Sequence, residues 1–167
     1  FGLQGGDFIH VHPASRWFFK CWPAEHMAEL VARLQAAGHA VVLTAAPSRD
    51  EQAMVEAIQA RLPQPAFSLA GRLSLKELAA LTKASRLFIG VDSAPMHMAS
   101  AVNAPTTAVF CSTIPAFGFT PLAQNALVVE TGEALDCRPC GLHGYKSCPK
   151  GHFRCAETID PVVFKIP

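Results

Sequence analysis

Two segments of this sequence combine residue types that bind phosphate groups. In the first, the apolar run 87–91 is followed by Asp92, Ser93 and Ala94 and then by His97, where an alanine-rich helical pattern begins. The first turn of a helix carries unpaired backbone N–H groups and the positive end of the helix dipole, and both attract an anion. An ordinary helix cap formed by Asp92 or Ser93, with His97 as a structural histidine, is the alternative interpretation.

The second segment supplies a hydroxyl, a guanidinium and an ammonium within six residues, from Ser15, Arg16 and Lys20. It directly follows a predicted strand at 8–12. Arginine can form two hydrogen bonds to neighbouring phosphate oxygens, and lysine adds a compact positive charge, so the set suits a diphosphate. A solvated loop anchored by its aromatic residues 17–19 is the alternative.

Weaker candidates follow the next two predicted strands. Thr44 ends the apolar run 40–44 and, together with the charged residues 49–51, is in reach of a ribose or a donor sugar. A loop and a helix cap with acids in its first turn explain the same residues without a ligand. Leu73 follows the third predicted strand, where it is placed to pack on a base.

The elements that position these residues alternate between strand and helix. We predict strands at 8–12, 40–44, 67–70, 86–91, 105–111 and 126–130, and helices at 23–37, 50–62, 74–84 and 95–103. Strands that are apolar throughout are buried on both faces, so the pattern predicts an α/β fold with a Rossmann-like, doubly wound parallel sheet. The first and fourth strands are neighbours in such sheets, which makes the two phosphate-binding segments adjacent walls of one cleft.

Four cysteines lie close together near the C-terminus: Cys137, Cys140, Cys148 and Cys155. The first pair has the C-x2-C spacing of a metal half-site, and four thiolates can complete a structural Zn or Fe site. The second pair lacks that spacing, so free thiols and labile disulfides stay open as alternatives. Such a site would fasten a loop rather than take part in chemistry.

The composition predicts one globular domain. The chain has 167 residues, of which 50% are hydrophobic and 16% charged, and a net charge of +1 gives no electrostatic case for nucleic acid. The sequence lacks G-x-G-x-x-G, Walker lysine and G-x-S-x-G motifs, which argues against dinucleotide, NTP-hydrolysis and serine-hydrolase sites. We predict a Rossmann-like domain over 1–131 and a Cys-rich segment over 132–167 that packs on the same domain.

Four ordered blocks of the sequence resemble a known family. They are His-Pro-Ala-Ser-Arg at 12–16 with Lys-Cys-Trp-Pro at 20–23, Val-Val-Leu-Thr at 41–44, Leu-Ala-Gly-Arg-Leu-Ser-Leu-Lys-Glu-Leu at 69–78, and Gly-Val-Asp-Ser-Ala-Pro-Met-His at 90–97. In this order they resemble the C-terminal half of the family 9 glycosyltransferases, which are ADP-heptose:lipopolysaccharide heptosyltransferases. The first block is most similar to the heptosyltransferase III subgroup, and the resemblance covers nearly the whole chain.

The resemblance implies a GT-B enzyme, in which two Rossmann-like domains face a cleft. The N-terminal domain of the family holds the acceptor and an aspartate base, and the C-terminal domain holds the nucleotide-sugar donor. We therefore expect this chain to be the donor-binding half of a longer protein, without transferase activity on its own. The implied reaction is an inverting displacement at the anomeric carbon, in which ADP leaves and no cofactor is needed for catalysis.

The resemblance also implies roles for the candidate residues. Lys20 matches the lysine that neutralises the leaving diphosphate, and it is the predicted catalytic residue; Ser15 and Arg16 match its phosphate-side neighbours. The donor-binding turn of the family corresponds to Asp92, Ser93, Ala94 and His97, although the family often has glycine in place of Ala94. Leu73 falls near the adenine. Beside Thr44, an acid that contacts the heptose is expected, and Arg49, Asp50 and Glu51 are the alternatives for its place.

The implied partners are ADP-heptose and the lipopolysaccharide core. The implied location is the cytoplasm, and a peripheral association of the full-length protein with the inner face of the inner membrane stays open. Two other functions also remain open from the residues themselves. One is a GT-B transferase that uses another nucleotide sugar, and the other is a non-catalytic interaction module stapled by metal at the cysteines.

Overall fold

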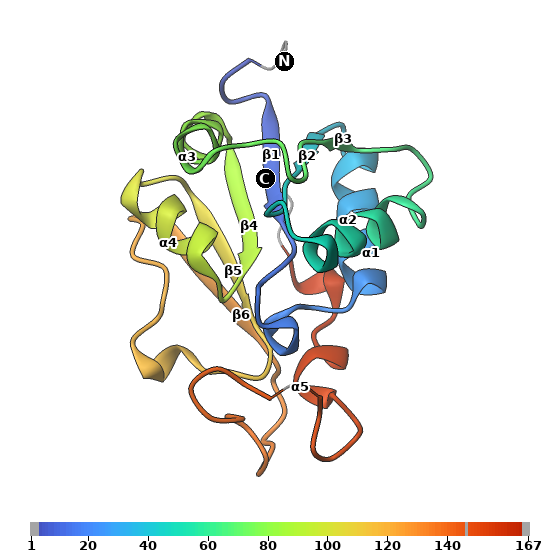
Figure 1. Cartoon of the computed structure of the whole chain (residues 1–167), viewed down its shortest axis with the longest axis vertical. Helices are drawn as coiled ribbons and strands as arrows, with labels where there is room; N and C mark the ends of the chain where they lie inside the picture. Colours follow the sequence, from blue (N-terminus) through green and yellow to red (C-terminus); the bar gives the residue numbers. More distant parts are fainter. Residues whose placement is uncertain (1–3, 146, 165–167) are drawn as a thin grey trace.

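The computed structural model describes residues 4–145 and 147–164, and its centre is a sheet of six parallel strands (Figure 1). The strands are β1 (Phe8–His12), β2 (Ala40–Leu43), β3 (Phe67–Ser68), β4 (Leu87–Val91), β5 (Thr106–Phe110) and β6 (Ala126–Glu130). Their order is β3-β2-β1-β4-β5-β6, and every neighbouring pair is parallel. The predicted doubly wound sheet is thus confirmed, with β1 and β4 side by side at the point where the chain changes direction.

Two pairs of helices cover the sheet, one pair on each face (Figure 1). One pair is α1 (Ala24–Ala36) with α2 (Arg49–Gln59), and the other is α3 (Leu75–Ala84) with α4 (Ala94–Ala101). Short helical turns complete the chain: α5 (Arg154–Glu157), η1 (Phe18–Lys20), η2 (Pro115–Phe117) and η3 (Pro161–Val163). Ser74 and Glu77 form a capping box at the start of α3. The third strand is shorter than predicted, because regular pairing with β2 covers only two residues.

Strand β1 decides which side chains reach each face of the sheet. All five of its residues are buried, and Ile9 and Val11 pack into the large core beneath α1 and α2. Since side chains alternate along a strand, His10 and His12 face the opposite side, toward α3. Two polar rings therefore lie in the interior on the α3 side of the sheet.

The Cys-rich segment lies against the same domain. The Trp22 indole donates a hydrogen bond to the Ala156 carbonyl at 3.2 Å and stacks on Phe164, with ring centroids 5.3 Å apart. Phe19 stacks on Phe153 at 5.0 Å. The boundary at residue 131 stays a prediction. Within the described ranges, no helix is long and apolar enough to cross a membrane.

Candidate functional site

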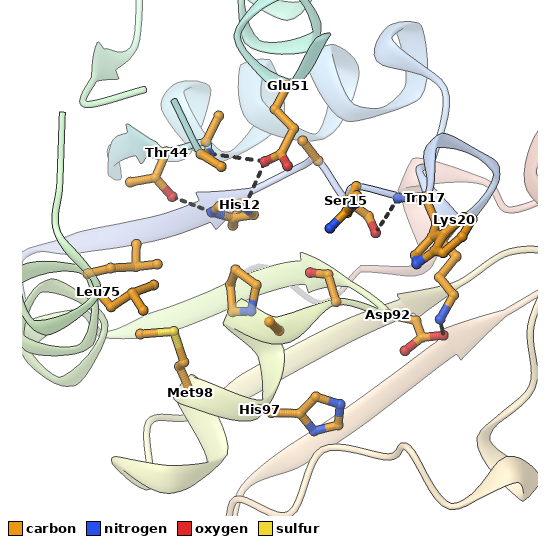
Figure 2. Close-up of a pocket in the computed structure, with 18 of the residues that line it drawn as sticks. His12, Ser15, Trp17, Lys20, Thr44, Glu51, Leu75, Asp92, His97 and Met98 are labelled. Atoms are coloured by element: carbon orange, nitrogen blue, oxygen red, sulfur yellow. Dashed lines mark hydrogen bonds and ion pairs between the residues drawn. The ribbon is translucent and has the colours of Figure 1, made fainter. Parts of the chain in front are cut away.

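A cavity of about 470 Å³ opens over the carboxyl ends of β1, β2 and β4 (Figure 2). This is the edge of the sheet where ligands bind in doubly wound folds. All nine residues predicted to bind a ligand line this cavity: Ser15, Arg16, Lys20, Thr44, Leu73, Asp92, Ser93, Ala94 and His97. Segments up to 82 residues apart in the sequence (15 to 97) thus meet around one space.

A buried ion pair forms one wall of the cavity. Lys20 Nζ lies 2.6 Å from Asp92 Oδ2, and the two side chains are only 8% and 5% exposed. The hydroxyl of Thr113, which follows β5, donates to the same Asp92 oxygen at 2.7 Å. The turn after β5 therefore holds Asp92, and Asp92 in turn holds the ammonium group of Lys20 at the cavity wall.

The turn from β4 into α4 lines the cavity with Ser93, Ala94 and His97. Ser93 occupies the N-cap position, but its hydroxyl donates back to the Val91 carbonyl at 3.3 Å and does not cap the helix. Ala94 is helical and keeps an ordinary backbone conformation. Gly90, just before the turn, is required for packing, because an added Cβ would lie 2.7 Å from the Phe88 ring.

A second polar group lies on the neighbouring wall. His12 Nδ1 is 2.8 Å from the Thr44 hydroxyl, and His12 Nε2 is 3.8 Å from Glu51 Oε2 (Figure 2). The neighbouring His12 is the largest cause that lowers the pKa of Glu51; burial opposes this shift, and the hydrogen bond from the Ala46 N–H at 3.0 Å lowers the pKa further. Arg49, Asp50 and Glu51 were the alternatives for a sugar-contacting acid after β2, and of these three residues only Glu51 lines the cavity.

The far end of the cavity is apolar. Leu73 lies just before α3, Leu75 and Leu78 lie at its start, and Met98 comes from α4. In Figure 2, Leu75 and Met98 lie to the left, Lys20 and Asp92 lie to the right, and Glu51 lies between the two groups. The cavity thus passes from an apolar end, past a carboxylate, to a cationic end.

Sequence reasoning missed several contributors to this site. His12 and Thr113 were not predicted as site residues, although the alternation of His10 and His12 along one strand signals two histidines on one face. Thr113 carries no local signal, because it reaches Asp92 only through the pairing of β4 with β5. The cavity rim also has Trp17 stacked on His143, with ring centroids 5.6 Å apart.

The predicted four-cysteine metal site is not formed in the described structure. In residues 4–145 and 147–164, no group of three or more His, Cys, Asp or Glu side chains is placed to hold a metal ion. The Cys140 thiol instead donates to the Cys137 carbonyl, and Cys148 Sγ accepts from the Phe153 N–H. Burial raises the pKa of the Cys155 thiol to about 11.

The buried histidine His10 gives the fold a predictable dependence on pH. Burial, followed by the nearby His12 charge, lowers the pKa of His10 from 6.5 to about 3. Between pH 6.5 and about pH 3, His10 therefore binds a proton in the unfolded chain but stays neutral in the folded chain. We expect the free energy of unfolding to fall by up to about 1.4 kcal/mol for each pH unit between pH 6 and pH 4. Urea titrations of the wild type and His10→Gln across this range test it, since equal slopes would contradict the assignment.

Comparisons with known proteins agree with this geometry. The profile of "Glycosyltransferase family 9 (heptosyltransferase)" matches residues 4–145. Lipopolysaccharide heptosyltransferase 3 of Escherichia coli is 38% identical over 130 residues, which cover 77% of this chain and 38% of that protein. The chain therefore spans less than half the length of this curated relative.

Solved structures share the fold. The E. coli ADP-heptose lps heptosyltransferase II superposes with a TM-score of 0.70 at 27% identity, over 81% of this chain and 44% of that one. TibC of enterotoxigenic E. coli is an iron-containing dodecameric heptosyltransferase solved with ADP-D-β-D-heptose. It superposes with a TM-score of 0.68 at 18% identity, over 96% of this chain and 44% of that one. The match to the family profile covers most of the chain, and the chain belongs to glycosyltransferase family 9.

Proposed function

We propose that the cavity binds ADP-heptose and that the chain is the donor-binding part of an inverting heptosyltransferase. The observation that carries the proposal is the position of Lys20, a buried cation at the wall of a cavity on the ligand-binding edge of the sheet. Structural relatives supply the chemical class of the ligand, because E. coli heptosyltransferase WaaC has been solved with ADP and with ADP-2-deoxy-2-fluoro heptose.

The diphosphate is assigned to the cationic end. Lys20 provides a charge there, and Arg16 lines the same cavity with five potential donors. The first turn of α4 adds the positive end of its dipole. The Ser15 hydroxyl accepts from the Trp17 N–H at 3.2 Å, which leaves its own proton for a phosphate oxygen.

The nucleoside is assigned to the other end. Leu73 and Leu75 form an apolar surface for the adenine, and the ionised Glu51 lies between this surface and Lys20. A carboxylate accepts hydrogen bonds from hydroxyl groups. In this orientation the ribose lies beside Glu51, and the diphosphate continues toward Lys20.

The chemistry that follows is electrostatic. When an acceptor hydroxyl attacks the anomeric carbon, the bond to the diphosphate breaks and negative charge develops on the leaving ADP. Lys20, Arg16 and the α4 N-terminus are arranged to stabilise that charge. The proposal places the lipopolysaccharide core acceptor and the base on a part of the protein beyond this chain. A cytoplasmic location, with or without contact to the inner membrane, stays a prediction for the whole protein.

Calorimetry with ADP, UDP and GDP on this chain tests the nucleotide assignment. We expect ADP to bind and the two other nucleoside diphosphates to bind more weakly, because they share the diphosphate but not the adenine. Tighter binding of UDP or GDP would favour a GT-B transferase with another donor. No binding of any of the three would leave the cavity without its assigned ligand and would contradict the proposal.

A further inference from the structure

A second cavity of about 470 Å³ adjoins the ligand cavity, and we call it the aromatic groove. Among the described residues that line it, four are aromatic: Trp17, Phe18 and Phe19 from the segment around η1, and Tyr145 from the Cys-rich segment. Phe, Trp and Tyr make up only 8% of the sequence, so the groove gathers aromatic rings well beyond their average frequency. Arg16 and Trp17 line both cavities, so the two cavities share a wall.

Three of the four aromatic rings are open to solvent. Trp17 is 49% exposed, Phe18 46% and Tyr145 55%, whereas Phe19 is buried and stacks on Phe153. Keeping large apolar side chains in contact with water costs free energy. Several such side chains around one hollow are typical of a surface that binds a ligand or a partner.

The Cys-rich segment is shaped to bring Tyr145 to this groove. Gly144 has a φ of +79°, which favours glycine, and a Cβ added there would lie 2.9 Å from Phe19 Cδ1 and 3.0 Å from Ser112 Oγ. Only glycine therefore lets the segment approach Phe19 this closely. The neighbours of Gly144 divide between the two cavities: His143 stacks on Trp17 and lines the ligand cavity, whereas Tyr145 lines the groove.

The groove begins at the cationic end of the ligand cavity. Figure 2 shows Trp17 next to Lys20, on the side away from Leu75 and Met98. In the proposed orientation the nucleoside lies at the leucine end and the diphosphate lies at Lys20, so the transferred sugar follows beyond the diphosphate. An acceptor must reach that sugar to react with it. The groove is therefore on the side where the acceptor approaches.

Aromatic rings can bind sugars through their faces. The face of the ring carries partial negative charge, which attracts the polarised C–H bonds on one side of a sugar ring, and the contact also removes apolar surface from water. Arg16 adds N–H donors for hydroxyl oxygens at the shared wall. Phe18 and Tyr145 line the groove but not the ligand cavity, so a ligand other than the donor is needed to cover them.

We infer that the aromatic groove binds a sugar ring of the acceptor saccharide, with Phe18 and Tyr145 as its main contacts. This inference rests on the proposed function and deepens it, because it gives this chain a part in holding the acceptor. The reacting hydroxyl and the base remain on the part of the protein beyond this chain. A saccharide of several rings can contact both parts, and the Cys-rich segment then serves to present Tyr145 to it.

A fluorescence titration tests the groove, with the deacylated core oligosaccharide of lipopolysaccharide as the probe. The sequence has two tryptophans, and Trp22 is fully buried, so a change in emission reports on Trp17. We expect the oligosaccharide to change the emission of the ADP-saturated chain along a saturable curve. Tyr145→Ala should bind it about three- to tenfold more weakly, as for the loss of one aromatic contact, whereas Tyr145→Phe, which keeps the ring, should bind it as the wild type does.

Leu142→Ala is the matched control. Leu142 belongs to the same segment and is as exposed as Tyr145, but it lines neither the groove nor the ligand cavity. This variant should bind the oligosaccharide with wild-type affinity. Saturation-transfer NMR provides a second readout: irradiation of the aromatic protons of the wild-type protein should transfer magnetisation to C–H protons of the oligosaccharide, and the transfer should be weaker in Tyr145→Ala.

Calorimetry distinguishes the acceptor from the sugar of the donor. If the groove holds the acceptor, Tyr145→Ala should leave the affinities for both ADP and ADP-heptose unchanged. A loss of affinity for ADP-heptose, with ADP binding unchanged, would assign the groove to the transferred sugar and overturn the inference.

The remaining failures are also distinguishable. If ADP binds but the oligosaccharide does not, or if folded Tyr145→Ala binds the oligosaccharide as tightly as the wild type, the inference is wrong and the proposed function stands. The absence of saturation transfer in the wild type also overturns it, and this measurement needs no variant. If ADP does not bind at all, the proposed function is wrong, and the acceptor assignment is wrong with it.

Discussion

Replacing Lys20 with methionine is expected to remove most of the affinity of this chain for ADP and to destabilise the fold. Methionine keeps the length of the side chain but not its charge, so Asp92 would lose its partner at 2.6 Å and retain only the Thr113 hydroxyl. Leaving one member of a buried ion pair alone costs about 3 kcal/mol of stability. Losing a charged hydrogen bond to the diphosphate should weaken ADP binding by about 10- to 100-fold.

A double variant separates these two effects. In Lys20→Met/Asp92→Asn the unpaired charge is gone, and the amide can still accept from Thr113. We expect chemical denaturation to show that most of the lost stability returns, while calorimetry shows that the affinity for ADP does not. Lys83→Met, on the exposed surface of α3, changes the net charge equally and serves as control. Unchanged ADP affinity in folded Lys20→Met would contradict the assignment of the diphosphate to this end of the cavity.

The sequence was sufficient to predict where the cavity lies, because its signals are local. Strand 87–91 ends in polar residues, and the segment around Lys20 follows another buried run, so both had to lie at the carboxyl edge once the sheet was parallel. The order of the strands then placed β1 beside β4. Each of these steps depends on residues that are close in the sequence.

The contacts that complete the site could not be predicted in this way. Thr113 reaches Asp92 across 21 residues, and Thr82 reaches His10 across 72. Neither contact has a spacing that marks it, because each depends on which helix or strand packs where. The choice of Glu51 over Asp50 depended on the rotation of α2, since adjacent helical residues point in different directions.

At the cysteines, a local spacing predicted a metal site for which the described residues show no grouped ligands. Cys137 and Cys140 have the spacing of a metal half-site, but the segment is held by another residue between them. Arg138 donates from Nε to the Cys111 carbonyl at 2.8 Å, and from Nη2 to the Thr113 carbonyl at 2.8 Å and to Glu130 at 2.6 Å. The guanidinium thus joins the Cys-rich segment to the end of β5.

Arg138→Ala is therefore expected to be strongly destabilising. It would leave the carbonyls of Cys111 and Thr113 without their donor, and buried acceptors left unpaired cost about 1–3 kcal/mol each. We expect a loss of roughly 2–4 kcal/mol in urea denaturation. Arg138→Lys should recover only part of it, because an ammonium cannot reproduce the planar set of donors.

Arg138→Ala should also weaken ADP binding, because Arg138 holds the backbone of Thr113 and the Thr113 hydroxyl holds Asp92. Arg154→Ala is the matched control within the segment: Arg154 makes one ion pair, with Glu133, and is 54% exposed, so its loss should change neither stability nor affinity measurably. Treatment with a strong chelator tests whether the Cys-rich segment is held by the hydrogen bonds of Arg138 or by a bound metal. If chelation lowers the melting temperature of the wild type while Arg138→Ala does not, the segment is fastened by a metal and the role given to Arg138 is wrong.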